Sequence, residues 1–109
     1  MKQIFTLNQI DWSIHPPYLD PGLSSKIGHI IQSDDKKFIA GFWDAKGPGE
    51  LLEKPSSDEL ICILEGELLV EIAGEKFIAH SGDVVFWSVK NTPKITITDY
   101  VKAFYVAYS

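Results

Sequence analysis

Apolar residues along this chain come in short runs between polar turns, and the length and spacing of the runs are typical of β-strands. No segment of about eleven residues or more places apolar side chains at the spacing of an amphipathic helix. Glycine-rich turns separate most of the runs, so the pattern favours an all-β domain built as a sandwich, a jelly roll or a barrel. The predicted strands cover residues 26–32, 37–45, 59–65, 67–73, 76–79, 84–88, 94–98 and 101–108.

The first 25 residues differ from the rest because they hold half of the chain's six prolines, namely Pro16, Pro17 and Pro21. Proline lacks a backbone donor and interrupts sheet pairing. Residues 1–25 are therefore predicted to wrap the surface as an N-terminal arm, with a short strand near residues 4–7. Residues 26–109 then form one barrel domain without an internal repeat.

The predicted strand that begins at Glu59 is apolar on both faces. Side chains alternate along a strand, which gives two sets: Glu59, Ile61 and Ile63 on one face, and Leu60, Cys62 and Leu64 on the other. An antiparallel sheet normally turns one face to water, so a further surface is expected to cover the second set. A second copy of the chain is the expected cover, which predicts a homodimer. The alternative is that the N-terminal arm lies over this face.

Composition narrows the class of protein. The chain has 109 residues, 45% of them hydrophobic and 23% charged, which suits one soluble globular domain. Its apolar runs are too short to span a membrane, and its N-terminus lacks the apolar core of a signal peptide. A net charge of −5 without a basic cluster argues against a nucleic-acid partner. Cys62 is the single cysteine, so no internal disulfide forms and a reducing cytoplasm is the expected compartment.

One stretch has a spacing that resembles the first motif of the cupins. Gly47 is followed after five residues by two open positions that flank Lys54, after three more by Glu59, and after six more by Gly66. The later segment SGDVVFW, with Gly82 in the glycine position, resembles the start of the second cupin motif. Cupins fold as single-domain antiparallel jelly-roll barrels. The resemblance implies that fold, and it implies that Glu59 points into the barrel.

Many cupins hold a metal ion through two histidines, a glutamate and a third histidine. Here the first two histidine positions hold Glu53 and Pro55, and Pro93 stands where the third is expected. Glu59 alone remains of the four ligands, whereas a divalent site needs three or four converging donors. We therefore expect no catalytic metal and no cofactor, with a weak site on Glu53 and Glu59 left open.

Two longer segments, DELICILEGELLVEIAGEKFIAHSGDVVFW and DYVKAFYVAYS, narrow the resemblance. They are similar to the cupin domain of the EutQ family of ethanolamine-utilisation proteins and its small single-domain relatives. The match is good over the second half of the chain and poor over the first 45 residues. That family also lacks the metal histidines, and it belongs to ethanolamine breakdown in bacterial microcompartments. Ser88-Val89-Lys90 replaces the family's proline-lysine-glycine loop, so the resemblance does not name a substrate.

Glu59 is the first candidate for chemistry, because a carboxylate inside a barrel needs a partner or its pKa rises. A raised pKa suits a general acid or base, and the alternative is a buried acid satisfied for structural reasons alone. Tyr105 shares its face with Ala103 and Ala107, which leave room for its hydroxyl to reach Glu59. The alternative is a core tyrosine whose hydroxyl makes a structural hydrogen bond. His29 lies on an apolar face, where it either packs in the core or shuttles protons beside a carboxylate.

Trp43 and Trp87 are candidates to line a ligand pocket, with core or interface packing as the alternative. Glu53, at the rim of the predicted pocket, completes the predicted ligand-binding set with Glu59. Three functions stay open. The first is binding of a small polar metabolite without a metal. The second is a metal-independent isomerase or lyase in which Glu59 works with Tyr105 or His29 as acid and base. The third is a structural dimeric accessory protein whose barrel only presents a dimer surface.

Overall fold

The computed structural model describes residues 4, 13–14, 24–51 and 57–109. Within these residues all regular secondary structure is β-strand, as the hydrophobic pattern predicts. No helix that could cross a membrane occurs in this part of the chain. The strands are β1 (Ser13–Ile14), β2 (Ser24–Gln32), β3 (Phe38–Lys46), β4 (Gly49–Leu51), β5 (Asp58–Ile72), β6 (Glu75–His80), β7 (Val84–Trp87), β8 (Lys94–Ile97) and β9 (Tyr100–Tyr108).

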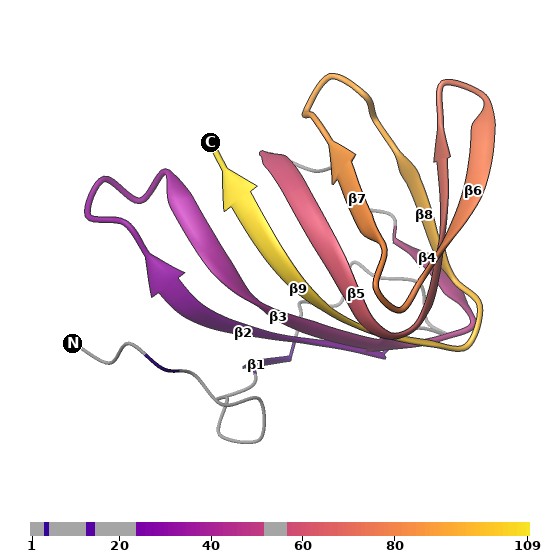
Figure 1. Cartoon of the computed structure of the whole chain (residues 1–109), viewed down its shortest axis with the longest axis horizontal. Coiled ribbons are helices and arrows are strands. Elements are labelled where there is room, and N and C mark those ends of the chain that lie inside the picture. The colour runs from indigo at the N-terminus through magenta and orange to yellow at the C-terminus, as the bar shows by residue number, and fades with distance from the viewer. Residues whose placement is uncertain (1–3, 5–12, 15–23, 52–56) are drawn as a thin grey trace.

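The strands pair antiparallel and form two sheets that share β5 (Figure 1). Sheet A has the order β1-β2-β3-β9-β5-β7. Sheet B has the order β4-β8-β5-β6. Figure 1 shows sheet A curving from β2 towards β7, with β4, β6 and β8 gathered at the opposite side. This curled antiparallel arrangement is the predicted jelly-roll barrel.

Strand β5 connects the two sheets because it bends without ending. Its 15 residues run first beside β9 and β7 and then beside β6 and β8. The prediction of two strands separated by a turn at Gly66 was wrong. Gly66 has a φ of 76° and follows a β-bulge between Ile63 and Glu65, so the chain changes direction while its ladder continues.

The N-terminal part of the chain is described only in places. Strand β1, which the sequence pattern did not predict, pairs with β2 at the edge of sheet A. Residues 5–7 of the predicted strand near residues 4–7 lie outside the described residues. The division into an arm over residues 1–25 and a barrel over residues 26–109 stays a prediction. Strand β4 is also additional, since none of the predicted strands covers residues 49–51.

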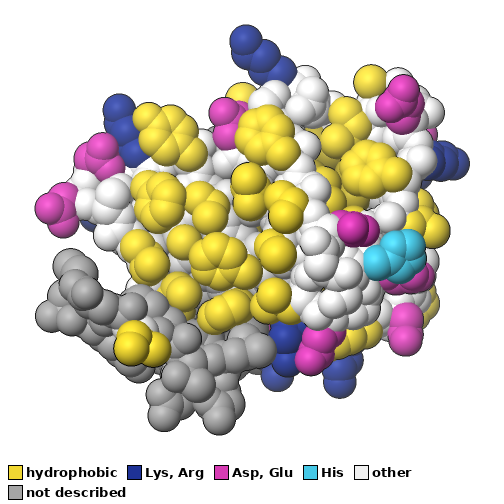
Figure 2. All heavy atoms as spheres, viewed as in Figure 1, with side chains coloured by type: hydrophobic (Ala, Val, Ile, Leu, Met, Phe, Trp, Pro, Cys, Tyr) yellow, Lys and Arg dark blue, Asp and Glu magenta, His cyan; other side chains and the backbone are white. Residues whose placement is uncertain are grey.

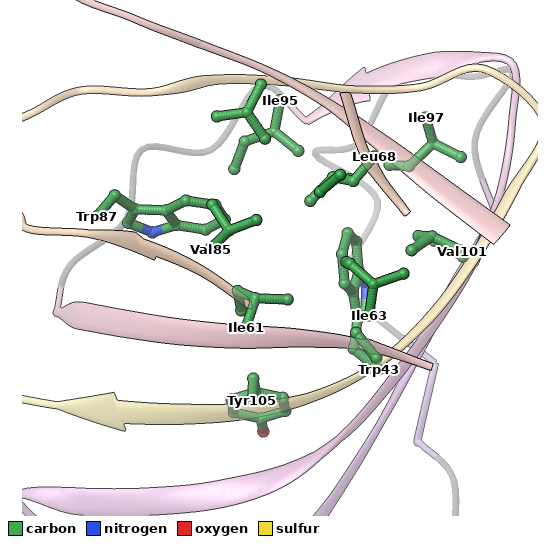
Figure 3. Close-up of a cluster of buried hydrophobic side chains, with 14 residues drawn as sticks. Trp43, Ile61, Ile63, Leu68, Val85, Trp87, Ile95, Ile97, Val101 and Tyr105 are labelled. Carbon is green, nitrogen blue, oxygen red and sulfur yellow. The ribbon is translucent and has the colours of Figure 1, made fainter. Parts of the chain in front are cut away.

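One cluster of buried side chains joins the inner faces of both sheets (Figure 3). Side chains from β5, β8 and β9 fill the region beside the bend in β5, and each of them contributes about 1.5–3 kcal/mol by leaving water. The five largest are Ile63, Leu68, Val70, Ile97 and Val101. The polar candidates lie towards the other end of the barrel, where β5 begins and β9 ends. We call it the upper end, as it stands at the top of Figure 1.

Candidate functional site

Glu59 lies on the inner face of β5 at the upper end of the barrel. It is paired with Ala107 of β9 on one side and with Trp87 of β7 on the other. Ile61, two residues further along, is 4% exposed in the core, so alternation turns Glu59 to the same side. Glu59 is half-buried. Asp58 faces the other way, and its carboxylate accepts a hydrogen bond of 3.0 Å from the backbone N–H of Val89.

Tyr105 is brought close to Glu59 by the register of β5 and β9. It is paired with Ile61 and therefore lies diagonally across from Glu59. Its side chain is 6% exposed, and burial, together with a smaller effect from the charge of Glu59, raises the pKa of Tyr105 above its ordinary value. At neutral pH Tyr105 therefore keeps its proton and offers a hydroxyl donor beside a carboxylate.

Trp87 contributes a buried donor to the same part of the barrel. The residue is 2% exposed, and its indole Nε1 has no hydrogen-bond partner among the residues that the structure describes. Trp43 differs, because its indole N–H donates to the hydroxyl of Ser25 at 2.8 Å inside the core. Of the two tryptophans predicted to line a pocket, Trp87 thus lies beside Glu59, and Trp43 has a structural hydrogen bond of its own.

Two further candidates are only partly placed. The backbone of His29 is paired with Gly41, which is paired in turn with Tyr105. A row of residues therefore runs from His29 through Gly41 to Tyr105 across three strands, but the side chain of His29 is not among those described. Glu53 lies outside the described residues.

Gly41 was not recognised from the sequence as part of the site. It has no side chain between His29 and Tyr105, and Ala107 is similarly small beside Glu59. The alternation along each strand was visible in the sequence, but the pairing of Gly41 with Tyr105 depends on the register between β3 and β9. Only the structure gives that register.

The donors present do not fit the metal centre of other cupins. No group of three or more histidine, cysteine, aspartate or glutamate side chains within the described residues is arranged to hold a metal ion. Proline, which has no side-chain donor, stands at two of the positions where a cupin ligand is expected, Pro55 and Pro93. We therefore assign no step to a metal.

A cleft of about 590 Å³ lies elsewhere, on the outer face of sheet A. Three strands line it with two ammonium groups, one carboxylate and two hydroxyls, from Ser24, Lys26, Asp44, Lys46 and Tyr100. These side chains were not candidates from the sequence, because they are far apart along the chain. The cleft gives an independent position against which binding inside the barrel can be tested.

Comparison with known proteins places the chain in a family. The family model described as ethanolamine utilisation protein EutQ matches residues 28–109, whereas no curated protein matches. A putative ethanolamine utilization protein Q from Salmonella typhimurium LT2 is 28% identical, with a TM-score of 0.68 over 78% of this chain and 69% of that chain. EutQ from Clostridium difficile is 21% identical, with a TM-score of 0.69 over 82% of this chain and 71% of that chain.

The barrel itself is shared more widely. A predicted oxalate decarboxylase from Thermotoga maritima is only 15% identical but has a TM-score of 0.77, over 97% of this chain and 98% of that chain. At that identity the likeness concerns the fold alone. The family model, in contrast, covers well over half of the chain, in the segments that form β3 to β9. The chain belongs to the EutQ family of cupins.

Proposed function

We propose that this EutQ-family cupin binds a small polar metabolite on the inner face of sheet A, at the upper end of the barrel, in the cytoplasm and without a catalytic metal. The buried indole N–H of Trp87 carries the proposal, because Trp87 is paired with Glu59 across the two strands and its N–H has no acceptor among the described residues. Leaving a buried donor unpaired costs about 1–3 kcal/mol, and a ligand that supplies the acceptor would recover that free energy.

The neighbouring groups indicate the chemistry of the ligand. Trp87 and Tyr105 offer hydrogen-bond donors, and Glu59 offers a negatively charged acceptor. A matching molecule has an oxygen acceptor at one end and an ammonium or hydroxyl donor at the other. Ethanolamine has both groups. It is the first compound to test, since the matching family and the Salmonella relative are named for ethanolamine utilisation.

An acid–base enzyme is the second reading, and the state of Tyr105 argues against it. An efficient general acid or base has a pKa near the working pH. Burial and the charge of Glu59 move the pKa of Tyr105 further above neutrality, so its hydroxyl serves as a donor that does not give up its proton. Glu59 with His29 stays the remaining acid–base pair for a metal-independent isomerase or lyase.

The test compares binding inside the barrel with binding in the outer cleft. A thermal-shift screen of ethanolamine and other small molecules with both donor and acceptor groups identifies ligands, and calorimetry measures their dissociation constants. Glu59→Gln keeps the shape of the side chain but removes its charge, so we expect binding to weaken at least about tenfold, the effect of roughly 1.4 kcal/mol. Lys46→Ala in the outer cleft is the control and should bind as the wild type does.

The opposite result, weaker binding by Lys46→Ala and unchanged binding by Glu59→Gln, would move the ligand to the outer cleft. Metal analysis of the purified protein checks the other half of the proposal. Stoichiometric nickel, iron, manganese or zinc would contradict it. Conversion of a bound ligand, followed by nuclear magnetic resonance and abolished by Glu59→Gln, would favour the enzyme over the binding protein.

A further inference from the structure

The outer face of sheet A carries charged side chains at its lower end, where β3 ends and β9 begins. Ser25 is 4% exposed, and Ala45 and Val101 are fully buried, so the residues that alternate with them point away from the barrel. Figure 2 shows hydrophobic side chains over most of sheet A, with charged side chains of both signs together at the lower margin. The outward residues of β2, β3 and β9 at this end are Ser24, Lys26, Asp44, Lys46, Tyr100 and Lys102.

The register of the three strands places Lys46 at the centre of the outer cleft. Lys46 of β3 is paired with Ser24 of β2 on one side and with Tyr100 of β9 on the other. Lys26 lies two residues along β2 from Ser24, and is therefore a diagonal neighbour of Lys46. Diagonal neighbours on one face of a sheet are about 7–8 Å apart, which long side chains can bridge. The ammonium groups of Lys26 and Lys46 and the hydroxyl of Ser24 can thus converge on one bound group.

The carboxylates in and beside the cleft have cationic neighbours. Asp44 is paired with Lys26 on one side and with Lys102 on the other. Glu65 Oε2 lies 3.8 Å from the Nζ of Lys102 and accepts a hydrogen bond of 3.3 Å from the hydroxyl of Tyr100. The charge of Glu65 is therefore balanced from within the protein. Because the hydroxyl of Tyr100 donates to Glu65, its ring forms a wall of the cleft.

Lys46 has no carboxylate directly across from it, since both of its cross-strand partners carry hydroxyls. Among the residues that the structure describes, no carboxylate oxygen lies within 4.0 Å of the ammonium group of Lys26 or Lys46. The lining of the cleft has two ammonium groups against one carboxylate, although the chain as a whole has a net charge of −5. A local excess of positive charge on an acidic protein favours an anionic ligand.

The size of the cleft and its donors indicate the class of anion. Its volume of about 590 Å³ lies within the range of about 300–1,000 Å³ that small-molecule sites have, so it can hold more than a bare ion. A phosphate monoester carries about 1.5 to 2 negative charges at neutral pH and has three strong acceptor oxygens. Lys26, Lys46 and Ser24 offer three donor groups, which one phosphoryl group can satisfy together. A carboxylate has less charge and fewer oxygens.

We infer that the outer cleft binds a small phosphate monoester through the ammonium groups of Lys26 and Lys46 and the hydroxyl of Ser24. The alcohol part of the ester occupies the remaining volume beside the ring of Tyr100. The carboxylate of Asp44 repels the phosphoryl group and limits the affinity. This site does not rest on the function proposed for the inner face of the barrel, because it lies on the opposite side of sheet A.

Isothermal titration calorimetry of the full chain with glycerol 3-phosphate, at constant ionic strength, tests the inference. We expect a dissociation constant of about 1 mM or lower. Succinate divides a similar charge between two carboxylates and should bind at least about fivefold more weakly. Lys46→Gln should weaken binding of glycerol 3-phosphate at least about tenfold, because it removes the central cation. Lys94→Gln is the matched control, since it removes the same charge from β8 of sheet B, and it should bind as the wild type does.

Asp44→Asn gives a second readout that a folding defect would not imitate. Loss of the repelling carboxylate should tighten the binding of glycerol 3-phosphate at least about threefold. Weaker binding by Asp44→Asn would overturn the inference, and so would a wild type that binds no glycerol 3-phosphate or binds succinate equally well. Equal weakening by Lys46→Gln and Lys94→Gln would also overturn it, since the attraction would then come from the overall charge and not from the cleft.

Discussion

Tyr105 shows how a single residue couples the core to the candidate site. Its ring belongs to the buried cluster (Figure 3), and its hydroxyl is close enough to Glu59 for the charge of that carboxylate to act on it. Burial disfavours the phenolate, and the charge of Glu59 disfavours it further. The folded protein therefore holds the proton of Tyr105 more tightly than the unfolded chain does, which makes stability depend on pH.

The sign of this dependence follows from the raised pKa. The contribution of Tyr105 is complete below its ordinary pKa of 10.0 and is lost as the pH rises from there towards the pKa of the folded state. We expect Tyr105→Phe to lose less stability than the wild type between about pH 8 and about pH 11. Urea unfolding at both values measures the change, and any loss of packing cancels because it is present at both. An equal alkaline loss in both proteins would contradict this prediction.

At the scale of the residue, the sequence predicted where a side chain points better than it predicted which groups surround that side chain. The resemblance to cupins implied that Glu59 points into the barrel, and in the structure Glu59 lies on the same face of β5 as the buried Ile61. That the N–H of Trp87 finds no acceptor among the described residues could not be predicted, because it depends on which groups the fold brings around the indole. The roles proposed for Glu59, Tyr105 and Trp87 stay predictions until a ligand is found.

At the scale of elements, Gly66 decides the path of β5. Its φ of 76° lies in the left-handed region, which side chains with a Cβ adopt at a cost of about 1–2 kcal/mol. A Cβ at this position would also collide with the backbone carbonyl of Tyr100 on β9. Backbone cannot rotate aside as a flexible side chain does, so the strain of a substitution would fall on the pairing of β5 with β9.

Gly66→Ala is therefore expected to lower the free energy of unfolding by more than about 3 kcal/mol, the sum of the left-handed conformation and the collision. Gly74→Ala is the matched control. Gly74 has a φ of 82°, but a Cβ there meets nothing within 4 Å, so it should cost only about 1–2 kcal/mol. Denaturant unfolding of both variants gives the comparison. Equal losses would mean that the approach to Tyr100 has no energetic effect.

The same glycine explains the main error in the predicted elements. Glycine between two apolar runs usually marks a turn, and the sequence was interpreted in that way. In a barrel, a glycine at a bulge can instead bend one strand from the first sheet into the second. Strand β4 was missed for a related reason, because the glycines and the proline of residues 46–50 masked a short pairing with β8 that only tertiary structure provides.

On the scale of the whole molecule, one core stabilises both sheets. Leu68 on β5 is fully buried between them, whereas its neighbour Leu69 is half-buried and points outward from sheet B. Leu68→Ala should cost about 2–5 kcal/mol, as for other large-to-small changes in a packed core. Leu69→Ala should cost clearly less. Thermal or urea unfolding distinguishes them, and a similar cost for both would contradict a shared core at this position.

The fold as a whole was predictable, and the reason is the agreement of two signals. The lack of helical spacing among the apolar residues argued against helices, and the spacing from Gly47 to Gly66 resembled one specific barrel. The apolar surface on the outer side of sheet A was harder to predict from the sequence. Leu60 and Cys62 indicated it on one strand, but Phe86, Val106 and Ile31 join them only through the order of strands in sheet A.

The continuity of β5 has a consequence for how the molecule comes apart. A strand that donates and accepts ladder hydrogen bonds in both sheets cannot leave one of them without loosening the other. Amide hydrogen exchange should therefore treat β3, in sheet A, and β8, in sheet B, as one cooperative unit whose exchange free energies converge as urea is added. Two sets of amides that open at different urea concentrations would show instead that the bend at Gly66 works as a hinge between two separately melting halves.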